Sequence, residues 1–375
     1  MDDFWVSLCE ALVCLAPDSS DAFTHHESLQ QAATFLQAQV LALPLGLRLG
    51  TRVGLLAFRA SVWVTSLRPF HRLDVSRRIA IVKRWSSVPV APVRQLFRAL
   101  RNLAVLPYFD GHARMSRAVA PIAHRGLASD TKTTVLIIGS GAGGAVTALE
   151  LATRGYEVLI VEEGHQQGDG VADPGATETI GALYRQRGMT PILGRVPIAY
   201  VEGCCVGGST ELNSGFWHRP PAETLLRWKA RYELDAAGVG EAREGLEPGD
   251  PVAGGVGRTL IPRAVDAGAT LLTGYRVDRL EMSGTRVSAA VLKAAPGTEG
   301  PPRVRVQADY VFVCAGATET PSLLRRSGVL RNVGDSLRIH PMLKVAARFP
   351  ERFSRADAGM SVLQVKEFWP EIVLG

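Results

Sequence analysis

The sequence is poor in the features that mark secreted, membrane-spanning or zinc-binding proteins. Its 375 residues include five cysteines, Cys9, Cys14, Cys204, Cys205 and Cys314, which are too few and too scattered for a disulfide framework. No spacing of cysteine and histidine suits a zinc site. The first residues are acidic where a secretory signal would be basic. We therefore expect a reducing, cytoplasmic compartment.

Long apolar runs are also missing. The longest uncharged run, residues 28–47, contains four Gln and a Pro, so it predicts an amphipathic or buried helix rather than a membrane span. With 46% hydrophobic and 21% charged residues, the chain can nevertheless bury a substantial core. The 38 Gly and 22 Pro indicate many turns but stay below the level of low-complexity sequence. Collagen, coiled coil and wholesale disorder are excluded.

The net charge of +6 belongs to the first third of the chain. Residues 1–130 carry 15 Lys and Arg against 9 Asp and Glu, whereas residues 131–375 carry 27 of each. From Arg48 to Arg125 there are only two acids, so this stretch has a net charge of +13. Because apolar residues recur there at helical spacing, we predict a basic, helical N-terminal region over residues 1–130.

One basic face can be read from this region. Arg94, Arg98 and Arg101 recur at the spacing of the leucines beside them, as in interfacial helices. The simpler interpretation is a solvated face packed on the next domain, and the alternative is a peripheral contact with a membrane. We do not expect a nucleic acid partner, because the arginines are spread among apolar residues without a recognisable binding motif.

A dinucleotide-binding pattern begins at Thr133, where short apolar strands and helices start to alternate as in a parallel α/β sheet. The apolar strand 135–138 leads directly into a G-x-G-x-x-G turn and a helix. In this pattern Gly139 permits the tight turn, Gly141 lets the backbone approach a pyrophosphate, and Gly144 lets helix and strand pack closely. The free amides at the helix start would then face the anion.

An acid follows the next strand. The expected strand, residues 157–161, has an apolar run over 158–161 and ends at Glu162, 18 residues after Gly144, where a carboxylate can accept hydrogen bonds from ribose hydroxyls. Glu163 is the rival acid. The motif alone does not distinguish NAD from FAD, but a late strand, residues 310–314, favours a flavoprotein layout in which separated segments hold the nucleotide.

Three further segments resemble the glucose-methanol-choline (GMC) oxidoreductases. Residues 203–217 are similar to the first signature of that family. They begin with Gly203 and contain a pair of glycines followed by Asn213. Residues 316–329 are similar to the second signature, with Leu330 in place of a glycine, and residues 333–341 resemble its G-x-x-L-x-x-H-P run. The N-terminal region and the lead-in before Gly203 are most similar to the long-chain alcohol oxidase and choline dehydrogenase-like branch.

The resemblance implies an α/β fold with a Rossmann-type FAD-binding domain and a parallel sheet. This domain would cover residues 131–341, interrupted by a shortened insertion at 222–257, and residues 342–375 would begin a truncated substrate domain. The implied cofactor is FAD. The implied reaction is oxidation of the CH–OH group of a hydrophobic primary alcohol by hydride transfer to the flavin, with the electron acceptor left open.

Residue by residue, the resemblance places three glycines at the FAD pyrophosphate, Glu162 at the adenosine ribose and the second glycine turn at the flavin. The backbone of Val277 would contact the adenine. A Gly-Gly-Ser turn lets main-chain amides approach the isoalloxazine and stabilise the reduced flavin anion. Cys204 and Cys205 are expected to be small buried residues rather than a redox pair. The implied cofactor-binding residues are Gly139, Gly141, Gly144, Glu162, Gly207, Gly208, Ser209, Asn213, Val277 and Gly316.

No catalytic base is assigned from the sequence. The family removes the alcohol proton with a C-terminal histidine that has an Asn or His partner, and nothing after His340-Pro341 supplies that pair. His218 and His340 lie beside motifs, but neither occupies the catalytic position of the family. Two alternatives remain: a truncated, non-catalytic flavoprotein that retains only FAD binding, and an NAD-dependent dehydrogenase, which the signature around Asn213 disfavours.

Overall fold

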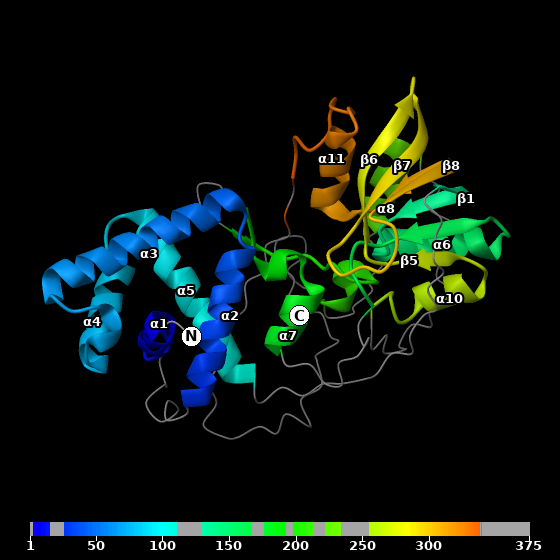
Figure 1. The fold of residues 1–375 in the computed structure, drawn as a ribbon. Helices are drawn as coiled ribbons and strands as arrows, with labels where there is room; N and C mark the ends of the chain where they lie inside the picture. Colours follow the sequence, from blue (N-terminus) through cyan, green and yellow to red (C-terminus); the bar gives the residue numbers. More distant parts are fainter. Residues whose placement is uncertain are drawn as a thin grey trace. The chain divides into compact units, whose positions relative to one another are not determined.

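The chain forms two compact units (Figure 1). The computed structural model describes residues 3–15, 26–110, 130–166, 176–192, 198–213, 222–233, 255–337 and 339. One unit, here called the helical unit, comprises Met1–Pro121 and Gly164–Cys205, and the other, the α/β unit, comprises Ile122–Glu163 and Val206–Gly375. The domain limits predicted from the sequence stay predictions, and the structure adds that Gly164–Cys205 groups with the N-terminal helices.

The helical N-terminal region is confirmed. Its helices are α1 (Asp3–Val13), α2 (His26–Ala42), α3 (Leu45–Ser66), α4 (Val75–Ser86) and α5 (Ala91–Asp110), with a 3-10 turn at Phe70–Arg72. The predicted helix over residues 28–47 is broken at Pro44, because proline cannot supply the amide that a continuous helix needs. Helix α4 is capped by Asp74, whose side chain accepts a hydrogen bond from the Arg77 amide at 2.9 Å.

Aromatic rings fill the core of the helical unit. Phe58 of α3 is fully buried, and the centroids of Phe70 and Phe97 each lie 5.1 Å from its ring centroid. Trp85 meets Phe58 edge to face at 5.3 Å. Gly54 lets α3 approach α5 closely, since a Cβ there would lie 2.8 Å from a methyl carbon of Leu96. Apolar and aromatic packing therefore holds one face of α3 against the core.

The segment Gly164–Cys205 adds α7 (Ala176–Leu183), a 3-10 turn (Arg185–Gly188) and the antiparallel hairpin of β3 (Thr190–Ile192) and β4 (Ile198–Tyr200). Arg185 and Glu202 form an ion pair between Nε and Oε1 at 2.5 Å, with both side chains largely buried. The Cys204 amide donates to the Leu183 carbonyl at 2.7 Å. The end of this segment is therefore held against the end of α7 and the 3-10 turn that follows it.

The α/β unit is built on a six-stranded sheet with the order β5-β2-β1-β8-β7-β6. The strands β5, β2, β1 and β8 run parallel, and β6, β7 and β8 form an antiparallel meander. The Rossmann-type fold is confirmed, with this antiparallel edge as an addition to the parallel sheet that was predicted. The strands are β1 (Asp130–Ile138), β2 (Val158–Val161), β5 (Thr270–Leu272), β6 (Tyr275–Ser283), β7 (Arg286–Ala294) and β8 (Arg303–Val313).

Helices pack on both faces of the sheet at β1 and β2, in agreement with the continuous apolar runs over residues 135–138 and 158–161. Val135 and Ile137 of β1 pack with α6 (Ala142–Thr153) and α10 (Leu260–Asp266). The alternate residues Leu136 and Ile138 pack on the other face, in a core that includes Leu323 of α11 (Gly316–Arg326). Two further elements belong to the unit, the 3-10 turn Gly208–Glu211 and helix α8 (Ala222–Tyr232).

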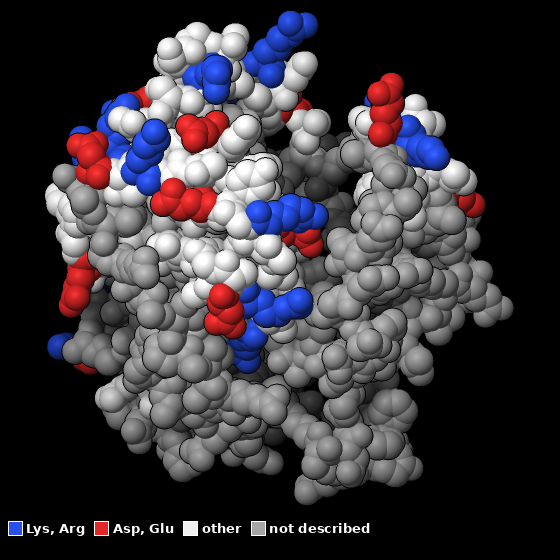
Figure 2. All heavy atoms as spheres, turned by 90° about the vertical axis from the view of Figure 1, so that its right-hand side faces the viewer, with Lys and Arg blue, Asp and Glu red and all other residues white. Residues whose placement is uncertain are grey.

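Charges of both signs are mixed on the exposed side of the α/β unit. Figure 2, in which the right-hand side of Figure 1 faces the viewer, shows blue and red side chains interspersed among the described residues. The sequence has equal numbers of basic and acidic residues over 131–375, in agreement with this picture. Among the described residues of this face, charge of one sign therefore does not mark a binding site.

Candidate dinucleotide-binding site

The carboxyl ends of β1, β2 and β8 meet at one edge of the sheet, where ligands bind in open α/β folds. The Gly139 amide donates to the Val161 carbonyl at 2.8 Å, and the Cys314 amide donates to the Ile138 carbonyl at 2.8 Å. Both bonds lie just past the ends of the strands. The turn that leaves β1 is therefore held between the ends of its two neighbours.

The first glycine turn, residues 139–144, uses its glycines in two ways. Gly139 has a φ of +98°, and a Cβ there would lie 2.5 Å from the Cys314 carbonyl oxygen. A Cβ on Gly144 would lie 1.8 Å from the Gly139 carbonyl oxygen, so helix α6 packs directly on the turn. A Cβ on Gly141, in contrast, would meet no atom within 4 Å. Only Gly141 faces open space.

The start of α6 is suited to an anion. Gly141 is its N-cap residue and offers no side chain to satisfy the first amides of the helix. Ala142 and Gly143 are exposed. Helix α11 likewise begins without a side-chain cap, at the end of β8, which is the parallel neighbour of β1. Unsatisfied amides and the helix dipole together favour a phosphate at such a position.

Glu162 lies below the first turn and is directed at it. Its side chain is buried, and its Oε2 accepts hydrogen bonds from the Ser140 amide at 3.0 Å and the Ser140 hydroxyl at 2.7 Å. The Gly207 amide in turn donates to the Ser140 hydroxyl oxygen at 3.0 Å. A continuous hydrogen-bond chain therefore runs from the acid after β2, through the first glycine turn, to the second one.

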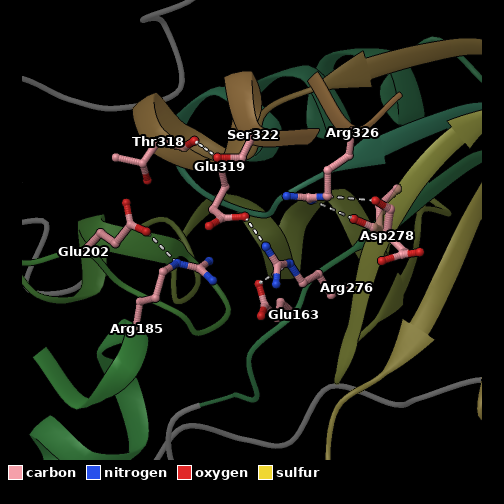
Figure 3. Close-up of polar contacts among 10 residues, drawn as sticks. Glu163, Arg185, Glu202, Arg276, Asp278, Thr318, Glu319, Ser322 and Arg326 are labelled. Atoms are coloured by element: carbon pink, nitrogen blue, oxygen red, sulfur yellow. Dashed lines mark hydrogen bonds and ion pairs between the residues drawn. The ribbon is translucent and has the colours of Figure 1, made fainter. Parts of the chain in front are cut away.

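Glu163, the rival acid, has a different environment. It forms an ion pair with Arg276 of β6 at 3.8 Å, and the same guanidinium binds Glu319 of α11 at 2.6 Å. Figure 3 shows Arg276 between these two carboxylates, with Arg326 beside the backbone at Asp278. Glu163 is thus engaged by an arginine, whereas Glu162 is engaged by the glycine turn.

The second glycine turn, residues 207–211, lies against the first. Gly207 and Gly208 have positive φ angles of +91° and +57°. A Cβ on Gly208 would lie 3.1 Å from the Gly141 Cα, so the two turns meet at this pair. Ser209 and Asn213 are exposed, and the Asn213 amide donates to the Ser209 carbonyl at 3.2 Å. Both halves of the predicted site are therefore adjacent.

Glu211 is a residue of this site that the sequence pattern does not predict. Its Oε1 accepts a hydrogen bond from the Gly257 amide at 2.9 Å, and its Oε2 lies 3.4 Å from Nε of Arg258. Its side chain is only 2% exposed. Burial raises the pKa of the Glu211 carboxyl, against the lowering effect of the Gly257 and Gly255 amides and of Arg258. The carboxylate fastens the second turn to residues 255–258.

Glycines make room for this carboxylate. A Cβ on Gly207 or Gly255 would lie 2.4 Å or 2.3 Å from Oε1 of Glu211. Thr210 adds a second link, because its hydroxyl donates to the Gly207 carbonyl and accepts from the Val256 amide at 2.9 Å. The one sign of a role for Glu211 in the sequence is that this ionisable residue stands within a run of small and apolar residues.

The other predicted residues are placed as follows. Val277 is buried at the start of β6, next to a register shift, and its carbonyl lies 3.5 Å from a terminal nitrogen of Arg326. Gly316 is exposed, with a φ of +83° and open space around its Cβ position. Cys314 lies beside Gly139, and burial raises the pKa of its thiol.

The remaining predictions concern histidines and cysteines. His218 and His340 lie outside the described residues, as do Ser214 to Trp217 of the first signature. Cys205 is buried and Cys204 is half-buried, and both are thiols. Among the described residues, no group of three or more His, Cys, Asp or Glu side chains could hold a metal ion.

The residues present fit a dinucleotide that carries a pyrophosphate and a ribose with free hydroxyls. Gly141 leaves space for close approach, the start of α6 offers amides, and Glu162 is a buried acceptor beside that turn. A carboxylate at this position disfavours a 2′-phosphate. The second turn extends the site beyond the nucleotide half.

Comparison with known proteins agrees with this arrangement. Residues 253–342 match the family model described as GMC oxidoreductase, and residues 137–181 match the NAD(P)-binding Rossmann-like domain. An uncharacterised GMC-type oxidoreductase of Sinorhizobium fredii is 33% identical over 292 residues, 64% of this chain and 58% of that protein. An uncharacterised GMC-type oxidoreductase of Mycobacterium tuberculosis is 27% identical and is matched over 83% of this chain and 60% of its own length.

A more distant relative has a named activity. A long-chain-alcohol oxidase of Arabidopsis thaliana is 25% identical over 60% of this chain and 38% of that protein. The chain thus spans about three fifths or less of the curated relatives that it matches. The motifs, the fold and the relatives agree, and each is similar to the GMC oxidoreductases, a family of FAD-dependent flavoproteins.

Proposed function

We propose that this chain binds FAD across its two glycine turns and takes part in a GMC-type oxidation of the CH–OH group of an alcohol. The observation that carries the proposal is the hydrogen-bond chain from Glu162 through Ser140 to Gly207. It joins the nucleotide-type turn to the turn that bears the GMC signature. A Rossmann turn alone would fit NAD equally well, so the second turn favours FAD.

The nucleotide half of FAD would lie over the first turn. The amides at the start of α6 would hold the pyrophosphate, and Gly141 would permit its close approach. Glu162 would accept hydrogen bonds from the ribose, since a carboxylate has about four acceptor positions and its Oε2 also serves Ser140. The carbonyl edge at Val277 and the exposed Gly316 would complete this half.

The flavin half would lie over the second turn. Gly207, Gly208, Ser209 and Asn213 would contact it, and Glu211 would hold the turn in place without itself facing the flavin. When bound, FAD supplies the acceptor for the hydride that leaves the alcohol carbon. The protein must supply main-chain amides that stabilise the resulting negative charge, and the amides of a glycine turn serve this purpose.

The substrate class rests on relatives. The long-chain-alcohol oxidases among them support a hydrophobic primary alcohol. Its hydroxyl proton must leave to a base as the hydride leaves the carbon, which gives the carbonyl product. His218 and His340 both lie outside the described residues, and neither is assigned this role.

A visible spectrum of the purified chain tests the cofactor. We expect a flavin band, and acid treatment should release the cofactor as FAD. A chain that carries no flavin and takes up none on reconstitution would contradict the proposal. A nicotinamide cofactor in place of flavin would instead support the NAD-dependent alternative.

Anaerobic addition of a medium-chain primary alcohol then tests the reaction. Bleaching of the flavin band is expected for an alcohol oxidase or dehydrogenase, and re-oxidation by oxygen or by a quinone would identify the acceptor. A bound flavin that no alcohol bleaches would support the alternative of a flavoprotein that retains only FAD binding.

A further inference from the structure

The outer face of α3 is apolar and exposed. In an ordinary surface helix the face opposite the core carries polar or charged side chains. Here the large apolar side chains of that face are between 51% and 70% exposed. In Figure 1, α3 runs along the outside of the helical unit. The members of this set, called the outer stripe, are Leu45, Leu49, Val53, Leu56, Trp63 and Val64.

The outer stripe is distinct from the face that packs on the core. Leu55, Phe58 and Val62 are buried, together with Thr51. With 3.6 residues per turn, these side chains lie on one side of α3 and the outer stripe lies on the opposite side. Helix α3 is therefore apolar on both sides. Large exposed apolar patches on proteins mark surfaces of interaction.

Arginines run beside the outer stripe. Helix α3 contains Arg48, Arg52 and Arg59 and has no acidic residue along its length. The same helical spacing places these three arginines in a row along one border of the outer stripe. Arg59 lies over the Phe4 ring at 4.8 Å, and Arg48 donates to the Leu41 carbonyl at 3.1 Å. Two of the three positive charges are thus held in place by the fold.

We infer that the outer stripe docks onto an anionic lipid surface, with α3 lying in the plane of the interface. An apolar face bordered by arginines without acids is the pattern of helices that bind such interfaces. Trp63 of the stripe is of the residue type that favours the water–lipid boundary. Among the helices that the structure describes, none combines the length and the apolar character needed to cross a bilayer.

The membrane contact therefore lies at α3 and not at α5, whose arginines predict a basic face from the sequence. The apolar side of α5 faces the core, because Phe97, Leu100 and Ala104 are buried. Its arginines therefore border a face that is already covered. Docking through α3 goes beyond the proposed function and does not depend on it, since it needs neither FAD nor an alcohol.

Flotation of the full chain with lipid vesicles tests the inference. We expect binding to vesicles of phosphatidylcholine with phosphatidylserine, and at least tenfold weaker binding to pure phosphatidylcholine or at high salt. A double variant, Leu49→Gln with Leu56→Gln, should lose at least tenfold in affinity. The double variant Arg48→Gln with Arg52→Gln should lose affinity for anionic vesicles only.

A matched control separates the stripe from general hydrophobicity. Leu226 of α8 and Leu330 are 66% and 62% exposed, much like Leu56 at 63%. The double variant Leu226→Gln with Leu330→Gln should bind as the unaltered chain does, within twofold. Equal losses in both double variants would overturn the inference, and so would a chain that binds no vesicles.

Two further readouts complete the test. Trp63→Phe should retain binding but lose part of the blue shift in tryptophan fluorescence that vesicles induce. Circular dichroism should show unchanged helix content in the glutamine variants, because the altered side chains are exposed. Sedimentation without lipid should show no self-association through α3, and a dimer that Leu49→Gln with Leu56→Gln dissociates would overturn the inference in favour of a contact between copies.

Discussion

The two glycine turns of the α/β unit meet at Gly141 and Gly208 but use their glycines differently. In the first turn Gly139 and Gly144 serve packing within the protein, and Gly141 alone is left open. In the second turn the missing side chain at Gly207 is replaced by the carboxylate of Glu211, and Gly208 lies against Gly141. One turn thus keeps a space for a ligand, whereas the other has filled its space from within the protein.

This difference separates two tasks that a shared glycine content conceals. In the proposed site the first turn must stay open for a phosphate, so its stability has to come from strand β8 and helix α6 behind it. The second turn is shaped before any cofactor arrives, because Glu211 and Thr210 fasten it to residues 255–258. Pre-shaping of this kind lowers the entropy lost when a ligand binds.

The largest effect is expected from Gly144→Ala. The new Cβ would lie 1.8 Å from the Gly139 carbonyl oxygen, so backbone atoms must move. We expect a loss of about 3 kcal/mol in the free energy of unfolding, at the upper end of overpacking effects, and loss of flavin binding. Urea unfolding followed by circular dichroism measures the first and flavin content the second. A variant as stable as the unaltered chain would refute the packing role of this glycine.

Gly141→Ala should separate binding from stability. Its Cβ meets no protein atom within 4 Å, so the free energy of unfolding should change by less than about 0.5 kcal/mol. The methyl group would, however, occupy the space proposed for the pyrophosphate, and FAD affinity should fall at least about tenfold, or about 1.4 kcal/mol. Titration of the flavin-free protein with FAD, followed by fluorescence, measures this affinity. Gly50→Ala, in an equally open position on α3, should leave FAD affinity unchanged.

Ser140→Ala removes the link between the turns. The hydroxyl donates to Glu162 and accepts from Gly207, so its loss should lower the free energy of unfolding by about 1–2 kcal/mol and weaken FAD severalfold. Thr153→Ala is the control, because this residue is exposed on a helix. Among the contacts described, its hydroxyl donates only to the Leu149 carbonyl. Similar losses in both variants would mean that the two turns are not coupled through Ser140.

The smallest effect is a pH dependence at Glu211. Because burial raises the pKa of this carboxyl above 4.5, the folded protein binds its proton at a higher pH than the unfolded chain does. Protonation of this group should therefore increase the free energy of unfolding as the pH falls from the raised pKa towards about 4.5. Glu211→Gln should lack this gain, so the unaltered chain should become more stable relative to the variant between pH 7 and pH 4.5.

Denaturant unfolding of both proteins at several pH values measures that difference. Glu223→Gln, which removes an exposed acid from α8, serves as the control and should follow the unaltered chain at every pH. A Glu211→Gln curve parallel to that of the unaltered chain would show that the buried carboxyl does not titrate as the geometry requires.

The sequence was sufficient where neighbours along the chain are also neighbours in space. The strand, the glycine turn and helix α6 follow one another directly, and Glu162 ends the next strand, so this half of the site could be predicted. The partners of Glu211 could not, because residues 255–258 lie far along the chain and only the tertiary fold brings them to the second turn. The hydrophobic periodicity of the sequence does not predict a contact of that kind.

The helical unit gives the same lesson. Helical spacing predicted apolar faces on several segments, but it could not say which face the core would cover. Helix α5 has its apolar face buried around Phe97, whereas α3 has enough apolar residues for two faces and buries only the one around Phe58. The antiparallel edge of the sheet was likewise not foreseen, because alternating strands and helices do not specify how a late strand such as β8 pairs with β7.

The segment from Gly164 to Cys205 begins and ends at the same place in the fold. A Cβ on Gly164 would lie 2.1 Å from the Cys204 carbonyl oxygen, and His165 and Cys205 form a parallel bridge. An excursion whose two ends already touch behaves as a module, because its exchange for a shorter or longer piece alters little at the point of attachment. A short loop grafted between Glu163 and Val206 would therefore show whether Glu162 and Gly207 keep their positions without this segment.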